Sequence, residues 1–152
     1  MLKRLFWMPL TAVLLLPLSG CDKDKNEDTP QPDATIIDKK ITFNIYSETD
    51  YTDAPWEDSK MKLTLNLKRI SINPHKETVV LDTTLGWIAF RDLPKITSKA
   101  QLVKRLSSVN KKEEGVVISI TKLVSINGYH TTFAHTLTID KDKADEVVEV
   151  RL

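Results

Sequence analysis

The 152-residue chain is poor in the residue types that build many functional sites. It has one cysteine, three histidines and four glycines. A single cysteine cannot form a disulfide within the chain, which excludes a disulfide scaffold. No phosphate-binding loop, dinucleotide fingerprint or nucleophile elbow around a serine is present in the sequence. The common nucleotide-binding and serine-hydrolase motifs are therefore excluded as well.

Long hydrophobic runs and an excess of one charge are also missing. The longest apolar stretch, Leu5 to Leu18, contains Pro9 and Pro17 and is shorter than the roughly 20 residues of a transmembrane helix. The formal net charge is +1. Such a balance gives no electrostatic reason to expect nucleic acid as a partner.

The one cysteine follows the apolar stretch directly, in the run Leu18-Ser19-Gly20-Cys21. With Lys3 and Arg4 before the apolar stretch, this run resembles the lipobox of a bacterial lipoprotein. The resemblance implies a signal peptide over residues 1–20, a diacylglycerol on Cys21 and an N-acyl chain such as palmitate on the new amino terminus. The alternative is an ordinary signal peptide or a membrane span with an unrelated thiol nearby.

Processing at this site changes what the mature chain can do. It removes Lys3 and Arg4, which leaves 20 basic against 21 acidic residues. With the thiol of Cys21 used for lipidation, no cysteine remains for catalysis or metal binding. We expect no cofactor beyond the covalent lipid, and the lipid anchor makes the membrane a partner.

A polar segment follows the cysteine. Residues 21–35 contain Pro30 and Pro32, and Asp22 to Asp33 has no aliphatic or aromatic residue, which predicts a disordered tether. Its early acidic residues, which Lys23 and Lys25 interrupt, resemble the signal that sends Bacteroidota lipoproteins to the cell surface; they are Asp22, Asp24, Glu27 and Asp28. The expected location is the outer membrane, facing outward. Enterobacterial inner-membrane retention, a periplasmic orientation and a plain soluble linker are the alternatives.

Residues 36–152 are dominated by a period of two. Apolar side chains alternate with polar ones over 41–46 and 61–67, which predicts half-buried strands. The apolar phase shifts near Lys68 and Arg69, as a β-bulge would produce, and Asn73-Pro74 ends the strand. Further strands are expected at 78–81, 86–91 and 147–152.

The clearest local signal is Asn127-Gly128, which favours a two-residue type I′ hairpin turn. The turn fixes a register that places mostly apolar pairs on one side of the hairpin. The expected pairs are Ile126 with Tyr129, Val124 with Thr131, Lys122 with Phe133, Ile120 with His135, Ile118 with Leu137 and Val116 with Ile139.

One amphipathic helix is expected near residues 98–110. Ser98 and Gln101 have the spacing of a capping box, and an apolar stripe follows at Leu102, Val103, Leu106 and Val109.

A short stretch then suggests the fold type. Thr83 to Pro94 reads Thr-Thr-Leu-Gly-Trp-Ile-Ala-Phe-Arg-Asp-Leu-Pro, which resembles transthyretin-like and Cna-B-like β-sandwiches. In those domains the phenylalanine and the leucine enter the core. The expected fold is mainly β, a single antiparallel Ig-like sandwich of about seven strands with the helix inserted. The resemblance carries over no catalytic residue.

Metal and acid–base sites have weak support in this sequence. His130 and His135 lie on opposite faces of a strand, so they cannot converge on one zinc ion. Two acidic loops contain Glu48, Asp50, Asp53, Glu57 and Asp58, and Asp140, Asp142 and Asp145. Calcium binding or glycoside hydrolysis by these carboxylates is an alternative to solvated turns, although neither loop has EF-hand spacing.

The first acidic loop also carries aromatic residues. Tyr46, Tyr51 and Trp56 lie near Asp50 and Asp53, a combination able to stack on sugars or anchor a protein contact. Equally, Tyr46 and Trp56 can fold back and cap the core.

The sequence therefore favours a lipid-anchored, non-enzymatic binding or accessory module that binds an unknown protein or glycan at the envelope or surface. A fimbrial or assembly subunit is the first alternative. A small glycan-acting hydrolase is the second.

Overall fold

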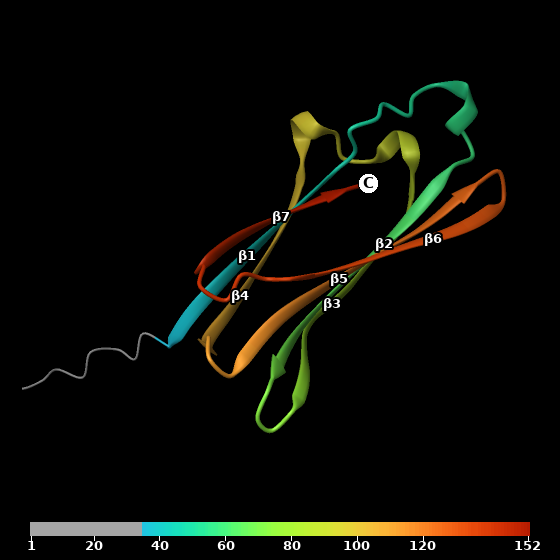
Figure 1. The fold of residues 1–152 in the computed structure, drawn as a ribbon. Helices are drawn as coiled ribbons and strands as arrows, with labels where there is room; N and C mark the ends of the chain where they lie inside the picture. Colours follow the sequence, from blue (N-terminus) through green and yellow to red (C-terminus); the bar gives the residue numbers. More distant parts are fainter. Residues whose placement is uncertain (1–34) are drawn as a thin grey trace, which may run out of the picture. The chain divides into compact units, whose positions relative to one another are not determined.

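The computed structural model describes residues 35–152, so the expected signal peptide, Cys21 and nearly all of the tether lie outside the described residues. Residues 35–152 form seven strands in two sheets (Figure 1). The mainly β prediction and the expected number of strands are confirmed. None of the helical segments in this part of the chain is long and apolar enough to cross a membrane.

The strands follow one another with short connections. They are β1 (Ile36–Tyr46), β2 (Lys60–Ser71), β3 (Lys76–Ala89), β4 (Ala100–Asn110), β5 (Glu114–Ile126), β6 (Tyr129–Thr138) and β7 (Asp145–Arg151). Three short 3-10 turns, η1 (Ala54–Trp56), η2 (Phe90–Asp92) and η3 (Ile96–Ser98), lie in the connections after β1 and β3.

The smaller sheet has the order β4-β1-β7. Strand β1 pairs antiparallel with β4 and parallel with β7, so the first and last described strands are neighbours. The predicted all-antiparallel sandwich is therefore wrong at this one pair, because the long connections between β1 and β7 allow them to run in the same direction. The N–H of Lys40 donates to the carbonyl of Ala144, and the N–H of Leu152 donates to the carbonyl of Tyr46. These bonds fix the parallel register at both ends of β7.

The larger sheet has the order β3-β2-β5-β6. Strands β5 and β6 form the expected hairpin, and the observed pairs run from Ile126 with Tyr129 to Ile118 with Leu137. Asn127 has φ 49° and Gly128 has φ 83°, the positive values that a type I′ turn needs. The predicted turn and register are confirmed.

Two details of β2 and β3 are also informative. The β2 and β3 register shifts between Leu67 and Lys68, which is where the sequence predicted a bulge. The two strands expected at 78–81 and 86–91 are instead one strand, β3, which ends at Ala89. Arg91 lies in the turn η2, not in a strand.

The predicted helix near 98–110 is wrong, because residues 100–110 form β4. Leu106 and Val109 are both buried, and between them Ser108 adopts φ 53° while the register with β1 shifts. A β-bulge adds one residue to one strand, so two core-facing side chains come to be three positions apart. The bulge therefore imitates the i, i+3 spacing of a helix.

The core lies between the two sheets. Its main cluster takes buried side chains from β1, β2, β4, β5 and β7, among them Phe43, Leu65 and Ile118. A second cluster at one end contains Phe90 and Leu93, the two residues expected to enter the core from the Thr83 to Pro94 stretch.

Candidate functional site

Strand β6 carries an apolar face that no other strand of residues 35–152 covers. The residues of this face, hereafter the β6 inner face, are Tyr129, Thr131, Phe133, His135 and Leu137. Four of them pair with apolar β5 residues that pack in the core clusters, and Phe133 pairs with Lys122 between them, so alternation directs all five to the same side. Nevertheless Tyr129 is 82% exposed and Phe133 is 53% exposed. Only Leu137 packs against the core cluster.

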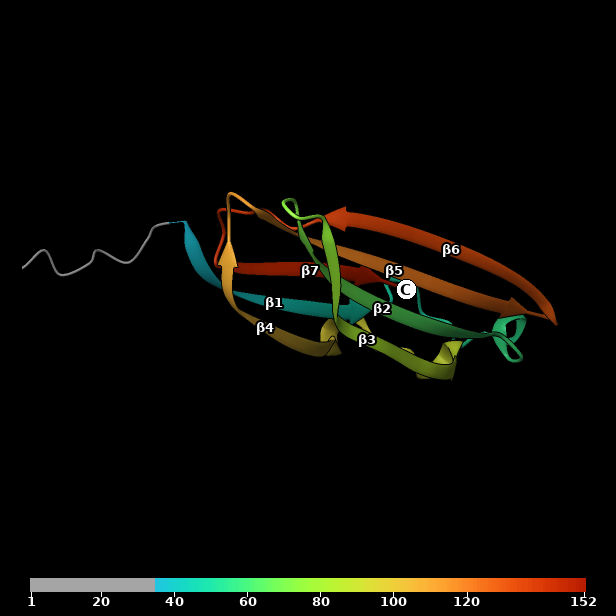
Figure 2. The same ribbon diagram turned by 90° about the horizontal axis from the view of Figure 1, so that it is seen from below.

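The unequal size of the two sheets explains this exposure. Lys122 of β5 donates to the carbonyl of Arg151 at the end of β7, and Val148 and Val150 of β7 belong to the same core cluster as Ile118 and Ile120, so β7 faces β5. With β7 at the edge of a three-stranded sheet, the fourth strand of the larger sheet has no strand opposite it among residues 35–152. Figure 2 shows β6 along the margin of the fold. Strand β6 therefore overhangs the β7 edge of the smaller sheet.

A shallow groove of about 280 Å³ lies at the turn end of this face, and Val124, Ile126, Tyr129, Thr131 and Phe133 are among the residues that line it. Lys122 forms one side of the overhang. Its Nζ donates to the carbonyl oxygen of Arg151 at 3.0 Å and lies 5.9 Å from the centre of the Phe133 ring. No carboxylate among the described residues pairs with this ammonium group. The overhang thus combines exposed aromatic surface with an available positive charge.

The aromatic loop that the sequence singled out packs on the core. The Tyr51 ring lies 5.3 Å from Trp56 and 4.6 Å from Phe90, measured between centroids, and Trp56 stacks on Phe90 at 5.9 Å. Tyr51 and Trp56 also pack against the second cluster. These two aromatic side chains close one end of the sandwich.

The other residues of that prediction are spread around the same end. Tyr46 is 4% exposed and has the Lys99 ammonium 4.2 Å from its ring centre, so its ring is not available to stack on a ligand. Asp50 pairs with Lys95 at 3.1 Å, and the hydrogen bond from Lys95 lowers the pKa of Asp50. Asp53 lines a separate hollow with Tyr51 and Arg91. The structure therefore brings Tyr51 close to Asp53 but buries Tyr46.

The second acidic loop is organised around lysines. Asp140 and Asp142 pair with Lys143 and Lys111, and the N–H of Asp142 donates to Asp140 Oδ1. This backbone hydrogen bond is the main reason that the pKa of Asp140 is lowered. Within residues 35–152, no group of three His, Cys, Asp or Glu side chains is placed to hold a metal ion.

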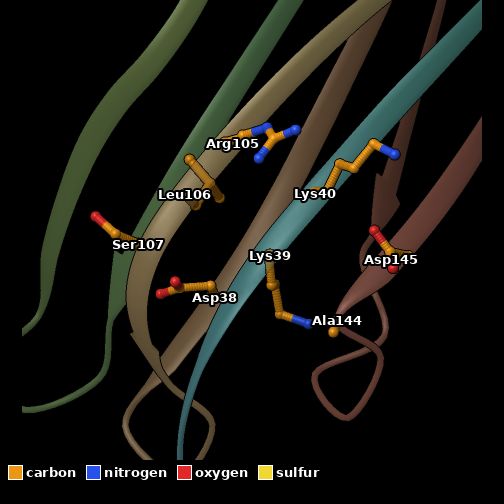
Figure 3. A pocket seen from close by; sticks show the side chains of 8 residues that line it. All are labelled: Asp38, Lys39, Lys40, Arg105, Leu106, Ser107, Ala144 and Asp145. Atoms are coloured by element: carbon orange, nitrogen blue, oxygen red, sulfur yellow. The ribbon is translucent and has the colours of Figure 1, made fainter.

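A larger open pocket of about 400 Å³ lies at the opposite end, beside Lys39 (Figure 3). Lys39 is buried, and its Nζ donates to the carbonyl oxygens of Asp140 at 2.7 Å and Lys143 at 2.5 Å. Figure 3 shows this side chain directed toward the turn at Ala144. Burial lowers the pKa of Lys39. Because the ammonium group satisfies two carbonyls of the β6–β7 turn, its role there is structural.

Sequence reasoning placed the β6 inner face on the core side but did not identify it as exposed. One signal was available, because seven strands cannot divide into two equal sheets. An unequal division leaves one strand uncovered. Which strand is left over depends on the strand order, which the sequence did not specify.

Comparison with known proteins assigns no family to this chain. No protein-family model, no curated protein and no solved structure matches it. The functional argument therefore rests on the residues and the geometry described above.

Proposed function

We propose that this chain is a lipid-anchored, non-enzymatic binding module of the cell envelope, and that the β6 inner face is its binding surface. The observation that carries the proposal is the exposure of Tyr129 and Phe133 on the core-facing side of a strand. Large apolar side chains gathered on an exposed face are typical of protein interaction sites. A partner would bury them as the core buries Ile118 and Ile120 of β5.

The location is part of the same proposal. The lipobox-like run ending at Cys21 supports a lipid anchor, and the acidic residues that follow it support surface display. The finer fold type is proposed to be transthyretin-like, which the burial of Phe90 and Leu93 in the core supports.

Site-specific photo-crosslinking in growing cells tests the binding role. A benzophenone side chain at position 129 should give discrete adducts of higher mass. The same group at position 79 serves as the control, because Val79 is also exposed but lies on β3 at the opposite edge of the larger sheet. Equal or absent crosslinking at both positions contradicts the proposal. A ladder at multiples of the chain's own mass would instead support the fimbrial alternative.

The anchor has an independent test. Cys21→Ala should release the protein from the membrane fraction, and protease added to intact cells should digest the unaltered protein. Membrane retention of the Cys21→Ala protein contradicts lipidation. Protection from protease in intact cells, with digestion after lysis, contradicts surface display and leaves the periplasmic location.

A further inference from the structure

We propose that the partner of the β6 inner face binds as an added β-strand along the outer edge of β7. This inference rests on the proposed binding function and names the partner's chemistry. The occupant is an extended segment of another protein, with apolar side chains at alternating positions and an acidic residue at the end that meets Lys122.

The backbone of β7 has an unused edge. Its bonds to β1 use the carbonyl of Ala144 and the N–H of Leu152, two residues of even number. Because the backbone groups of successive strand residues point to opposite edges, Val147 and Glu149 direct their N–H and C=O groups away from β1. The carbonyl of Arg151 points the same way, since it accepts the hydrogen bond from Lys122. The sheet order places no strand of residues 35–152 on that edge.

The β6 inner face lies across from the space beside this edge. Strand β6 is the neighbour of β5 in the larger sheet and β5 faces β7, while neighbouring strands in a sheet lie about 4.8 Å apart. A strand paired with β7 would therefore lie opposite β6. Its inward side chains would cover Phe133 and His135, while its backbone would satisfy the open groups of Val147 and Glu149. One added strand would therefore both pair with the open edge of β7 and cover the β6 inner face.

A second folded copy does not fit this space. If the β7 of another copy paired with this β7, the β5 opposite it would reach the layer that β6 already occupies. The segment Asp22 to Asp33 does not suit this space either, because it contains no aliphatic or aromatic residue to cover the β6 inner face. A single extended segment from a different protein avoids both problems, as in strand addition to exposed sheet edges generally.

The charge of Lys122 indicates one residue type that the partner strand carries. Lys122 lies near Arg151, where β7 ends, and has no acidic partner among residues 35–152. A carboxylate on the added strand would pair with Lys122, at the strand's C-terminal end if it runs parallel to β7 and at its N-terminal end if antiparallel.

Two synthetic nine-residue peptides of alternating valine and threonine test the inference, one with glutamate at its N-terminal end and one with glutamate at its C-terminal end. They are added to the full chain, extracted in mild detergent, and amide hydrogen exchange is followed. The expected result is binding of one peptide with slower exchange at Val147 and Glu149. A peptide of the same composition with its valines grouped should bind at least tenfold more weakly.

Substitutions distinguish the contribution of the β7 edge to peptide binding from that of the β6 inner face. Val147→Pro removes an outward N–H without touching the bonds to β1, and it should abolish peptide binding. Phe133→Asp and Tyr129→Asp should each weaken binding at least tenfold, whereas Val79→Asp, equal to Phe133 in exposure at 53%, should change it less than twofold.

Three outcomes would overturn the inference. They are equal binding of the alternating and grouped peptides, unchanged exchange at Val147 and Glu149, and a dimer in sedimentation that Phe133→Asp dissociates. If crosslinks form at position 129 while the β7 amides stay unprotected, the binding function stands and strand addition fails.

Discussion

Strands β5 and β6 are two halves of one hairpin, yet their equivalent faces have different surroundings. Ile118 of β5 is fully buried beneath the smaller sheet, while Phe133 of β6, with the same inward direction, is half exposed. Alternation of apolar and polar residues therefore shows which side of a strand is apolar. It does not show whether another layer covers that side.

The largest loss of stability is expected from a substitution on the covered strand, β5. Ile118→Ala should lower the free energy of unfolding by about 2–5 kcal/mol, because it opens a cavity in a close-packed core. Urea denaturation followed by tryptophan fluorescence or circular dichroism measures the change. A loss below about 1 kcal/mol would mean that β5 is less well covered than described.

The second largest loss of stability is expected at the turn that joins β5 and β6. Gly128→Ala places a Cβ at φ 83° and should cost about 1–2 kcal/mol through backbone strain alone, since no atom lies within 4 Å of the added Cβ. Gly86→Ala is the matched control, because that site is equally open and its backbone is extended in β3. It should be neutral or slightly stabilising. Equal effects at both glycines would contradict the type I′ turn.

The ion pair at the start of β5 should give a smaller, pH-dependent effect. Arg69 donates from Nε to Glu114 at 2.8 Å, and this hydrogen bonding lowers the pKa of Glu114. Because the folded-state pKa is below that of an unfolded glutamate, about 4.3, the contribution is present above that pH and is lost as the pH falls through the folded-state value. Glu114→Gln should flatten this part of the stability profile.

Asp50→Asn is the control for that experiment. Asp50 also has a lowered pKa, from its hydrogen bond with Lys95, but this pair lies at the surface. Solvent screens exposed pairs, so the change in acid stability should be smaller than for Glu114→Gln. A larger change for Asp50→Asn would show that the surface pair dominates the acid response.

The smallest expected effect is on the uncovered strand. Phe133→Ala should change the free energy of unfolding by no more than about 0.5 kcal/mol, as for most surface positions. Denaturation under the same conditions as for Ile118→Ala provides the direct comparison. A loss above about 2 kcal/mol would show that the β6 inner face is covered in solution and would remove it as a binding surface.

Local sequence signals predicted some elements well and one element wrongly. Asn127-Gly128 specified its hairpin because turn geometry and side-chain phase agree on one register. The phase shift near Lys68 marked a real bulge for a similar reason. Over 98–110 the same kind of signal misled, because the bulge around Ser108 places Leu106 and Val109 three residues apart on one face.

For the candidate site, the sequence identified residue types and the tertiary structure decided their exposure. The aromatic loop was singled out for Tyr46, Tyr51 and Trp56, but contacts with Phe90 and burial by the sheet give these rings packing roles. Phe133 appeared to be an ordinary core residue until the strand order placed it beyond the edge of the smaller sheet.

By itself, the sequence determined the mainly β class, the turn at Asn127-Gly128 and the apolar side of each strand it identified. These properties depend on neighbours within a few residues, so local chemistry is sufficient to fix them. Only the tertiary structure decided that residues 100–110 form a strand and that β7 pairs with β1. It also decided that β6 extends beyond β7, the edge strand of the smaller sheet. Those outcomes depend on which distant segments pair, because a strand is completed by hydrogen bonds that its own residues cannot supply.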